Sequence, residues 1–276
     1  MASTEKKLAN CWRFMNNRIL ISGSLKKHHA ENHIIYHENA LLVMRRILDK
    51  YPNGCFDMIF ADPPYFLSNG GFTCQNGQMV SVNKGDWDKS QGMAADMAFY
   101  EEWLGLCYAL LKPNGSIWVC GTHHNIYLIG YLMQTLGYHI LNNITWEKPN
   151  PPPNLSCRFF THSTETLLWA KKGKRAKHTF QYDVMKAQNG GKQMKSVWQI
   201  APPAASEKTL GKHPTQKPLA LLERCIQAAS NPNDWIFDPF MGSGTTGVAA
   251  LKHGRNFCGC EINDEFFELA KKRLQT

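Results

Sequence analysis

The chain has 276 residues, 43% of them hydrophobic, which is enough to form the core of one large α/β domain or of two smaller ones. Its apolar runs are too short to cross a membrane and its first twenty residues are too polar for a secretory signal, so we expect a soluble protein of the cytoplasm. The nine cysteines are scattered without a CxxC pair, which favours buried free thiols over disulfides or a metal site.

The excess of positive charge is concentrated in one segment. The net charge is +9, and residues 148–200 hold ten Lys or Arg against only two acidic residues. Aromatic residues are interleaved with these cations, a combination typical of surfaces that contact phosphates and stack on bases. The segment favours a nucleic acid as partner, but charge alone does not distinguish DNA from RNA, or either from a solvated face.

Along the chain, strands and helices alternate after an N-terminal arm. Residues 1–33 are polar and basic, with little pattern. From Ile34 onward the apolar spacing predicts strands at 34–37, 56–61, 116–121 and 138–146, with a turn at 112–115, and helices at 40–48, about 99–110 and 126–136. This alternation indicates βαβ units and a largely parallel sheet.

Four prolines in "KPNPPPN", residues 148–154, break the alternation, because proline fits neither a helix interior nor a central strand. The strand-like "TETLLWA" and the basic residues follow. Regularity returns with a helix that begins near Pro218, and then with a strand at 235–238, a helix, a strand at 256–261 and a final helix. We therefore predict two sheet-forming parts, 34–147 and 209–276, separated by a basic insertion at 148–208. We expect a mobile loop at 68–90, with its far end anchored by Asp86 and Trp87.

Two predicted strands end in Asp-Pro-aromatic motifs. "FDMIFADPPY" ends at Asp62 to Tyr65, and "WIFDPFMGSGTTG" continues from Asp238 into glycines and a helix start. Such a glycine loop lets backbone N–H groups approach an anion, and Glu261, nineteen residues after Gly242, is spaced to reach ribose hydroxyls. The GxxxxGK[ST] pattern is absent, which disfavours a nucleoside triphosphate. The ligand should be S-adenosylmethionine (SAM) or a dinucleotide, and both aspartates should lie on one edge of the sheet.

"DPPY" together with "DPFMGSGTT" resembles the DNA amino-methyltransferases that use SAM. The order of the motifs resembles the β group of that family, in which the cofactor block comes last. The strings "FADPPYFLSNGG", "NLSCRFFTHSTETLLWA" and "GKHPTQKP" resemble the second adenine methyltransferase of GATC-modifying (DpnII-type) restriction systems. The resemblance covers the chain from about Ile34 onward. It implies a Rossmann-like, mostly parallel seven-stranded sheet with permuted motif order and an inserted target-recognition segment.

The resemblance also implies how the reaction works. Adenine N6 is a poor nucleophile, so the Asp62 carboxylate and the Pro63 carbonyl would each accept one of its N–H groups and draw the nitrogen towards tetrahedral geometry. Pro64 keeps this unit rigid and Tyr65 would stack on a flipped base. The expected cofactor residues are Asn39, Asp62, Thr215, Gln216, Lys217, Asp238, Phe240, Gly242, Ser243, Gly244, Thr245 and Glu261. Of these, Lys217 would pair with the SAM carboxylate, and Asn39 stands where an aspartate is common.

Several alternatives remain open at this stage. N4-cytosine methylation uses the same kind of amine, although a serine is commoner there in place of Asp62. RNA methylation and a non-catalytic DNA-binding protein are two others. His29, His33 and His37 would align metal ligands only if their segment were helical, so no metal is expected. The resemblance implies double-stranded DNA as substrate, acceptance of single-stranded DNA, and a homodimer in a bacterial or phage-encoded system.

Overall fold

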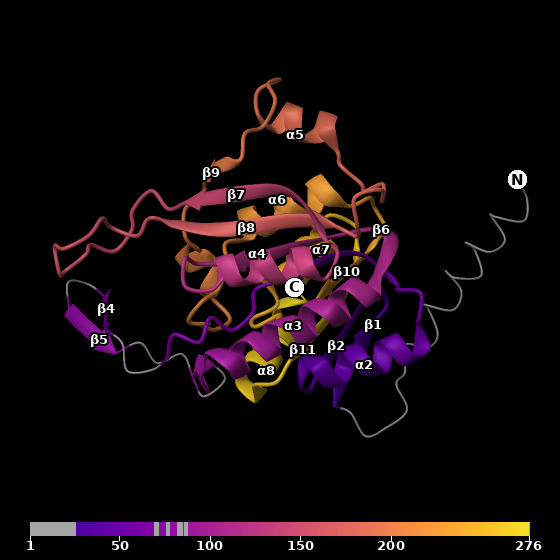
Figure 1. The fold of residues 1–276 in the computed structure, drawn as a ribbon, viewed down its shortest axis with the longest axis horizontal. Coiled ribbons are helices and arrows are strands. Elements are labelled where there is room, and N and C mark those ends of the chain that lie inside the picture. The colour runs from indigo at the N-terminus through magenta and orange to yellow at the C-terminus, as the bar shows by residue number, and fades with distance from the viewer. Residues whose placement is uncertain (1–25, 69–71, 76–77, 82–84, 86–87, 276) are drawn as a thin grey trace, which may run out of the picture.

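The computed structural model describes residues 26–275 except 69–71, 76–77, 82–84 and 86–87 (Figure 1). Its main sheet has nine strands in the order β1-β2-β11-β10-β3-β6-β8-β7-β9. The strands are β1 (Lys27–Ala30), β2 (His33–His37), β3 (Phe56–Ala61), β6 (Leu111–Gly121), β7 (His139–Glu147), β8 (Thr164–Lys171), β9 (Val197–Gln199), β10 (Trp235–Asp238) and β11 (Asn256–Glu261). A separate hairpin pairs β4 (Phe72–Gln75) with β5 (Gln78–Ser81).

The centre of the sheet is parallel, as predicted. Strands β2, β11, β10, β3 and β6 all run in one direction, and β8 runs against them between β6 and β7. Seven strands, from β2 to β7 in sheet order, therefore match the expected count. The sheet has nine strands because β1 and β9 extend its two edges. These edge strands have four and three residues, too few to show an apolar period in the sequence.

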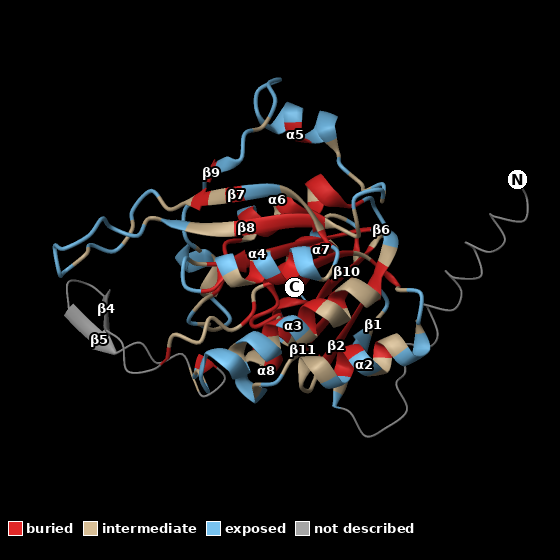
Figure 2. Cartoon of the chain, in the orientation of Figure 1, coloured by how far each residue is buried: buried red, intermediate tan, exposed pale blue. Residues whose placement is uncertain are grey.

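Helices cover both faces of the sheet, and the strands between them are buried (Figure 2). One face packs against the first three helices, and the opposite face packs against the later ones, giving two apolar clusters. The first set is α2 (Ala40–Lys50), α3 (Met93–Leu110) and α4 (Ile126–Thr135). The second set is α5 (Tyr182–Gln188), α6 (Leu219–Ala229), α7 (Thr245–Lys252) and α8 (Asp264–Arg273), and a 3₁₀ helix, η2, spans Ala205–Lys208. The α/β class predicted from the alternation is confirmed.

Three local predictions differ from the structure. The sheet already begins at Lys27, inside the stretch interpreted as an arm, because β1 forms a hairpin with β2. The turn predicted at 112–115 does not precede the strand but lies within β6. These residues form an irregularity inside β6, whose register with β3 shifts between Phe56 and Met58. The predicted loop 68–90 contains the β4–β5 hairpin, and Asp86 and Trp87 lie outside the described residues.

The basic insertion is not a separate unit. Strand β8 lies in the middle of the main sheet, and β9 pairs with β7 at the edge. The sequence "TETLLWA" was expected as a strand, but the proline-rich stretch before it concealed that this strand returns to the same sheet. The cysteine prediction is confirmed for six of the described thiols, which are free and buried, whereas Cys157 is exposed. None of the described helices is long and apolar enough to span a membrane.

Candidate active site

The two Asp-Pro-aromatic motifs lie on neighbouring strands, as the sequence predicts. β3 and β10 are hydrogen-bonded in parallel, with Phe237 opposite Ile59. Asp62 follows β3, Asp238 ends β10, and Glu261 ends the next strand, β11. Three carboxylates therefore lie along the carboxyl edge of the sheet, where open α/β sheets bind their ligands.

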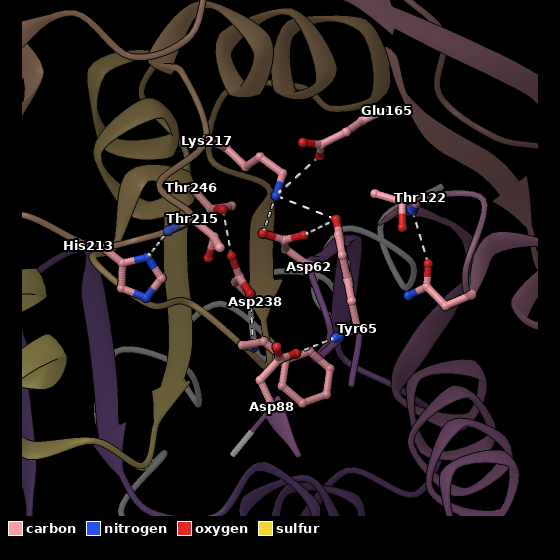
Figure 3. A network of polar contacts seen from close by, with 12 residues as sticks. Asp62, Tyr65, Asp88, Thr122, Glu165, His213, Thr215, Lys217, Asp238 and Thr246 are labelled. Carbon is pink, nitrogen blue, oxygen red and sulfur yellow. Dashed lines mark hydrogen bonds and ion pairs between the residues drawn. The ribbon is translucent and has the colours of Figure 1, made fainter. Parts of the chain in front are cut away.

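Asp62 is held by two donors, one from its own motif and one from the far part of the chain (Figure 3). Its Oδ2 accepts a hydrogen bond from Nζ of Lys217 at 2.5 Å, and its Oδ1 accepts one from the Tyr65 hydroxyl at 2.7 Å. The Lys217 ammonium also lies 5.5 Å from the centre of the Tyr65 ring. The carboxylate is thus fixed in orientation, while each oxygen keeps a lone pair for a further donor.

Lys217 was expected to pair with the carboxylate of SAM, but the structure directs its side chain elsewhere. Its Nζ lies between Asp62 and Glu165, 3.5 Å from Oε2 of Glu165, and Glu165 in turn forms an ion pair with Lys148 at 2.6 Å. Burial disfavours the Lys217 cation, but the carboxylates of Asp62 and Glu165 outweigh it and raise the pKa of Lys217 above its usual value. Lys217 is therefore a permanent cation beside Asp62.

The pKa of Glu165 is shifted in the opposite direction to that of Lys217. Burial alone would raise the pKa of this carboxyl, but Lys217 and Lys148 outweigh it and lower the pKa. Burial, followed by the charge of Asp62, raises the pKa of the Tyr65 phenol well above its usual value, so its hydroxyl stays a donor. Two cations thus balance two carboxylates around one cavity, and no motif in the sequence groups these four residues.

Asp88 fixes the backbone of the DPPY motif. Its buried carboxylate accepts hydrogen bonds from the N–H groups of Tyr65, Phe66 and Leu67 at 3.0, 2.9 and 3.3 Å, and from the Ser68 hydroxyl at 2.7 Å. Phe66 has a φ of 56°, a strained value for a residue with a side chain, which these bonds hold in place. Asp88 therefore anchors this end of the predicted loop, whereas Asp86 and Trp87, the anchor predicted from the sequence, lie outside the described residues.

The two proline carbonyls of the motif differ. Tyr100 on α3 donates its hydroxyl to the carbonyl of Pro64 at 2.9 Å. Within the described part of the chain, the carbonyl of Pro63 accepts no hydrogen bond. Pro63 therefore keeps a free acceptor next to Asp62.

A first cavity of about 410 Å³ opens at the ends of β2, β3, β10 and β11. Such a volume is in the range of small-molecule sites. Its walls include half of the twelve residues expected there: Asn39, Asp62, Thr215, Phe240, Gly242 and Glu261. Aromatic rings that the sequence analysis did not select, Phe66, Phe99 and Phe266, add apolar surface, and Lys89 is a cation in the same wall.

The glycine loop lies at one end of this cavity. Gly242 has a φ of 50°, and a side chain there would meet the His213 ring at 3.0 Å, so only glycine fits. The Asn39 side chain accepts hydrogen bonds from the N–H groups of Leu41 and Leu42, so it caps α2 as well as lining the cavity. Burial raises the pKa of Glu261, although backbone N–H groups oppose this shift.

Other predicted cofactor residues do not line the first cavity. Ser243 and Thr245 face inward, where their oxygen atoms accept hydrogen bonds from Arg273 of α8, and Gly244 packs against Ala270. Asp238 lies beneath the loop and accepts hydrogen bonds from Thr246 at 2.5 Å and from the Phe240 N–H at 2.9 Å. Burial raises its pKa to about 7 against these donors. These residues shape the loop.

A second cavity of about 440 Å³ lies on the other side of Asp62. Asp62 and Thr215 line both cavities. The second one is also lined by Pro63, Tyr65, Thr122, Trp146, Lys148, Glu165, Gln216 and Lys217. The Thr122 hydroxyl is buried and forms no hydrogen bond with the described residues. Aromatic and polar side chains that converge in this way suit a flat, hydrogen-bonding ligand such as a base.

His213, which belongs to the "GKHPTQKP" string but was not selected from it, lies behind Thr215. Its Nδ1 accepts a hydrogen bond from the Thr215 N–H at 3.3 Å, and its ring contacts Phe266. Burial, and then the charges of Lys217 and Arg273, lowers the pKa of His213 to about 4. The imidazole is therefore neutral at physiological pH and supports Thr215, one of the two residues that line both cavities.

The basic segment is divided between two ends of the sheet. Lys148 lies at the carboxyl edge and lines the second cavity. Lys171, at the other end of β8, pairs with Ser116, whereas Thr166 pairs with Gly121 at the edge beside the cavities. The cluster Lys171, Lys172, Lys174 and Arg175 therefore lies away from the two cavities. It does not form one surface with the residues around them.

The histidines of the N-terminal hairpin do not form a metal site. His29 lies in β1 and His33 and His37 lie in β2, so their segment is extended, as expected. Nε2 of His37 donates a hydrogen bond to the carbonyl of Ile262 at 3.0 Å. Among the described residues, no three His, Cys, Asp or Glu side chains are grouped to hold a metal ion.

Taken together, a parallel sheet with a glycine loop and two cavities that share one carboxylate define an α/β enzyme that brings a nucleotide-like cofactor to a second, flat substrate. Residues 56–272 match the DNA methylase family, and the chain belongs to that family. It is therefore a DNA methyltransferase.

Curated relatives extend over nearly the whole chain. The chain is 54% identical to the type II methyltransferase M2.LlaDCHI of Lactococcus lactis subsp. cremoris over 86% of its length and 90% of that protein. It is 51% identical to the type II methyltransferase M2.DpnII of Streptococcus pneumoniae, with 87% and 91% of the two chains covered.

Two solved structures share the fold. The SAM complex of M1.HpyAVI is 33% identical, with a TM-score of 0.66 and coverage of 88% of this chain and 98% of that one. The cytosine-N4-specific PvuII DNA methyltransferase, at 18% identity and a TM-score of 0.69, covers 88% and 86% of the two chains and shows the fold alone.

Proposed function

We propose that the chain transfers the methyl group of SAM to N6 of adenine within GATC sequences. The observation that carries this proposal is the position of Asp62, which lines both cavities. A cofactor in the first cavity and a base in the second would meet at this carboxylate. The 51% identity to M2.DpnII and the motifs of the GATC-modifying subfamily support adenine in GATC as the target.

The residues of the first cavity fit SAM. Glu261 offers a carboxylate for ribose hydroxyls, and Phe240 and its neighbouring rings offer apolar surface for the adenine ring of the cofactor. Gly242 lets the backbone come close to the ligand. When bound, SAM supplies an electrophilic methyl group. Lys217 lines the second cavity and Lys89 lines the first, so Lys89 is the lysine that we assign to the methionine carboxylate.

The second cavity would hold the flipped base. Tyr65 stacks on its face, while Asp62 and the free carbonyl of Pro63 each accept one N–H of the exocyclic amine. The Thr122 hydroxyl can donate to a ring nitrogen. When the methyl group passes to N6, its bond to the sulfur of SAM would break and leave a neutral thioether, and the fixed carboxylate of Asp62 would stabilise the positive charge that develops on N6. Asp62 then helps the nitrogen lose its extra proton to solvent.

Lys217 prepares this site rather than acting as a base. Its raised pKa keeps the ammonium protonated, so it cannot take the proton from N6. Its bond to Oδ2 fixes the plane of the Asp62 carboxylate before adenine arrives, which is the preorganisation that electrostatic catalysis requires.

Sequencing of DNA from a methylation-free bacterial host that expresses the chain tests the target. N6-methyladenine in every GATC supports the proposal. Methylated cytosine, another motif or unmodified DNA would each contradict it, and the Asp62→Asn variant, which keeps the side-chain shape, should leave the DNA unmodified.

Three further points rest on resemblance to the same subfamily. We propose that single-stranded DNA is also methylated, because no base pair must be broken to extrude its adenine. We also propose that the enzyme is a homodimer and that it acts in the bacterial cytoplasm within a restriction–modification system. Methylation of single-stranded oligonucleotides and sedimentation of the purified protein test the first two.

A further inference from the structure

The loop at 148–163 connects β7 and β8 at the sheet edge where Asp62 lies. Both of its ends border the second cavity: Lys148 is its first residue, Glu165 follows it in β8, and both side chains line that cavity. Figure 1 shows the loop extending well beyond the body of the sheet. Anything bound to this loop would therefore lie next to the mouth through which the base enters.

The far part of the loop is a defined turn. Oδ1 of Asn154 accepts hydrogen bonds from the Ser156 N–H at 3.1 Å and its hydroxyl at 2.8 Å, and Nδ2 donates to the carbonyl of Phe159 at 2.6 Å. Cys157 adopts a φ of 52° between them. A single amide thus closes the turn and fixes the direction in which the next residues leave it.

This turn presents two aromatic rings to solvent. The side chain of Phe159 is 59% exposed and that of Phe160 is 96% exposed. The Phe159 ring lies 5.4 Å from His162, whose ring stacks on His123 at 4.5 Å. His123 follows Thr122 in the cavity wall, so Phe159 is joined to the rim, whereas Phe160 projects from it. A fully exposed phenylalanine on a hydrogen-bonded turn indicates that the ring contacts a binding partner.

We propose that Phe160 inserts into the base stack of duplex DNA at the position that the target adenine vacates. This inference rests on the proposed function, in which adenine occupies the second cavity. Extruding a base leaves a gap between its neighbours, and an apolar ring that enters the gap replaces the lost stacking. Arg158, exposed two residues earlier, is placed to contact a phosphate next to the gap.

The test compares Phe160→Ala with the wild type on two matched substrates. One is a GATC duplex, and the other is the same duplex with an abasic site opposite the target adenine, where extrusion breaks no pair. We expect kcat/KM of the variant to fall about tenfold on the paired duplex, the effect of one lost stacking partner, and less than about twofold on the abasic duplex. Phe160→Trp should restore most of the loss.

Tyr131→Ala is the matched control, because it removes another exposed ring, from α4. This variant should leave kcat/KM unchanged on both substrates. An equal loss on both substrates for Phe160→Ala, or no loss on either, would overturn the inference. A wild-type enzyme that methylates no adenine in either duplex would instead refute the proposed function, so the two failures are distinguishable. Fluorescence of 2-aminopurine at the target position, weaker with the variant than with the wild type, provides a second readout.

Discussion

Nζ of Lys217 lies 2.5 Å from Oδ2 of Asp62, although the two residues are 155 positions apart in the chain. The contact joins the DPPY motif to the string that precedes α6, and so links the two sheet-forming parts of the chain. Because Lys217 is buried and also faces Glu165, its charge stabilises two carboxylates at once. The residue expected to bind the cofactor instead orients the group expected to bind the base.

Lys217→Met should therefore slow methyl transfer without weakening SAM binding. We expect kcat to fall about 100-fold, since the carboxylate loses its fixed orientation. Burial then dominates at Glu165, its pKa rises, and the acid limb of the pH–rate profile moves to higher pH. Removing one partner of a buried pair should also cost about 3 kcal/mol of unfolding free energy. Lys252→Met, which removes an exposed ammonium from its ion pair with the partly buried Glu223, is the control. If the variant had a normal kcat but bound SAM weakly, Lys217 would be a cofactor-binding residue, contrary to this prediction.

Asp88→Ala should destabilise the backbone conformation of the DPPY motif. The substitution leaves three backbone N–H groups and the Ser68 hydroxyl without their acceptor. We expect a loss of about 3 kcal/mol of unfolding free energy and a fall in kcat on every DNA substrate. Asp264→Ala, at an exposed position on α8, should change neither quantity. If Asp88→Ala kept full activity and stability in calorimetry and turnover assays, the carboxylate would not be the anchor.

His213 should make the stability of the protein depend on pH. Its pKa is about 4 in the folded protein, below the usual 6.5, so the unfolded chain binds the proton more readily between these values. Folding stability is therefore lost as the pH falls from 6.5 through 4, by about 3 kcal/mol for this group. His213→Asn, which keeps an acceptor for Thr215, should remove that part of the loss, and His29→Asn should not. Denaturant unfolding at pH 7 and 4.5 gives the comparison, and identical pH dependence for His213→Asn and the wild type would refute the assignment.

The division of the basic segment predicts different effects on DNA binding. Arg158→Gln should weaken DNA binding. It should also reduce the slope of log Kd against log salt concentration by about 1, the contribution of one phosphate contact. Lys174→Gln with Arg175→Gln, two exposed changes at the opposite end of β8, should leave the slope nearly unchanged. Binding titrations at several salt concentrations test both. A larger effect from the double variant would place the DNA at that end of the sheet.

The sequence alone predicted the parts that depend on local pattern. The parallel strands, the helices and the two Asp-Pro-aromatic motifs follow from residues near one another in the chain, and Asp62, Asp238 and Glu261 accordingly lie where predicted. The partners of Asp62 could not be predicted in this way. Lys217 reaches it only because the residues that precede α6 line the same cavity as Asp62, and a motif string does not show in which direction a lysine points.

The same reasoning explains the other differences. Glu165 and Lys148 belong to a segment whose high charge suggested a surface, but β8 enters the middle of the sheet and places Glu165 in the wall of a cavity. Ser243 and Thr245 match a cofactor motif, yet Arg273 turns their oxygen atoms inward. Asp88 lies next to Asp86, and only the hydrogen bonds to Tyr65 and its neighbours identify it as the anchor.

The most direct test of the account is the identity of the methylated nucleoside. Purified protein is incubated with SAM and a GATC duplex, the DNA is digested, and the nucleosides are identified by mass spectrometry, with Asp62→Asn in parallel. We predict N6-methyladenine with the wild type and no methylated nucleoside with Asp62→Asn, although both proteins bind SAM equally. N4-methylcytosine, or undiminished methylation by Asp62→Asn, would contradict the central claim that Asp62 activates the adenine amine.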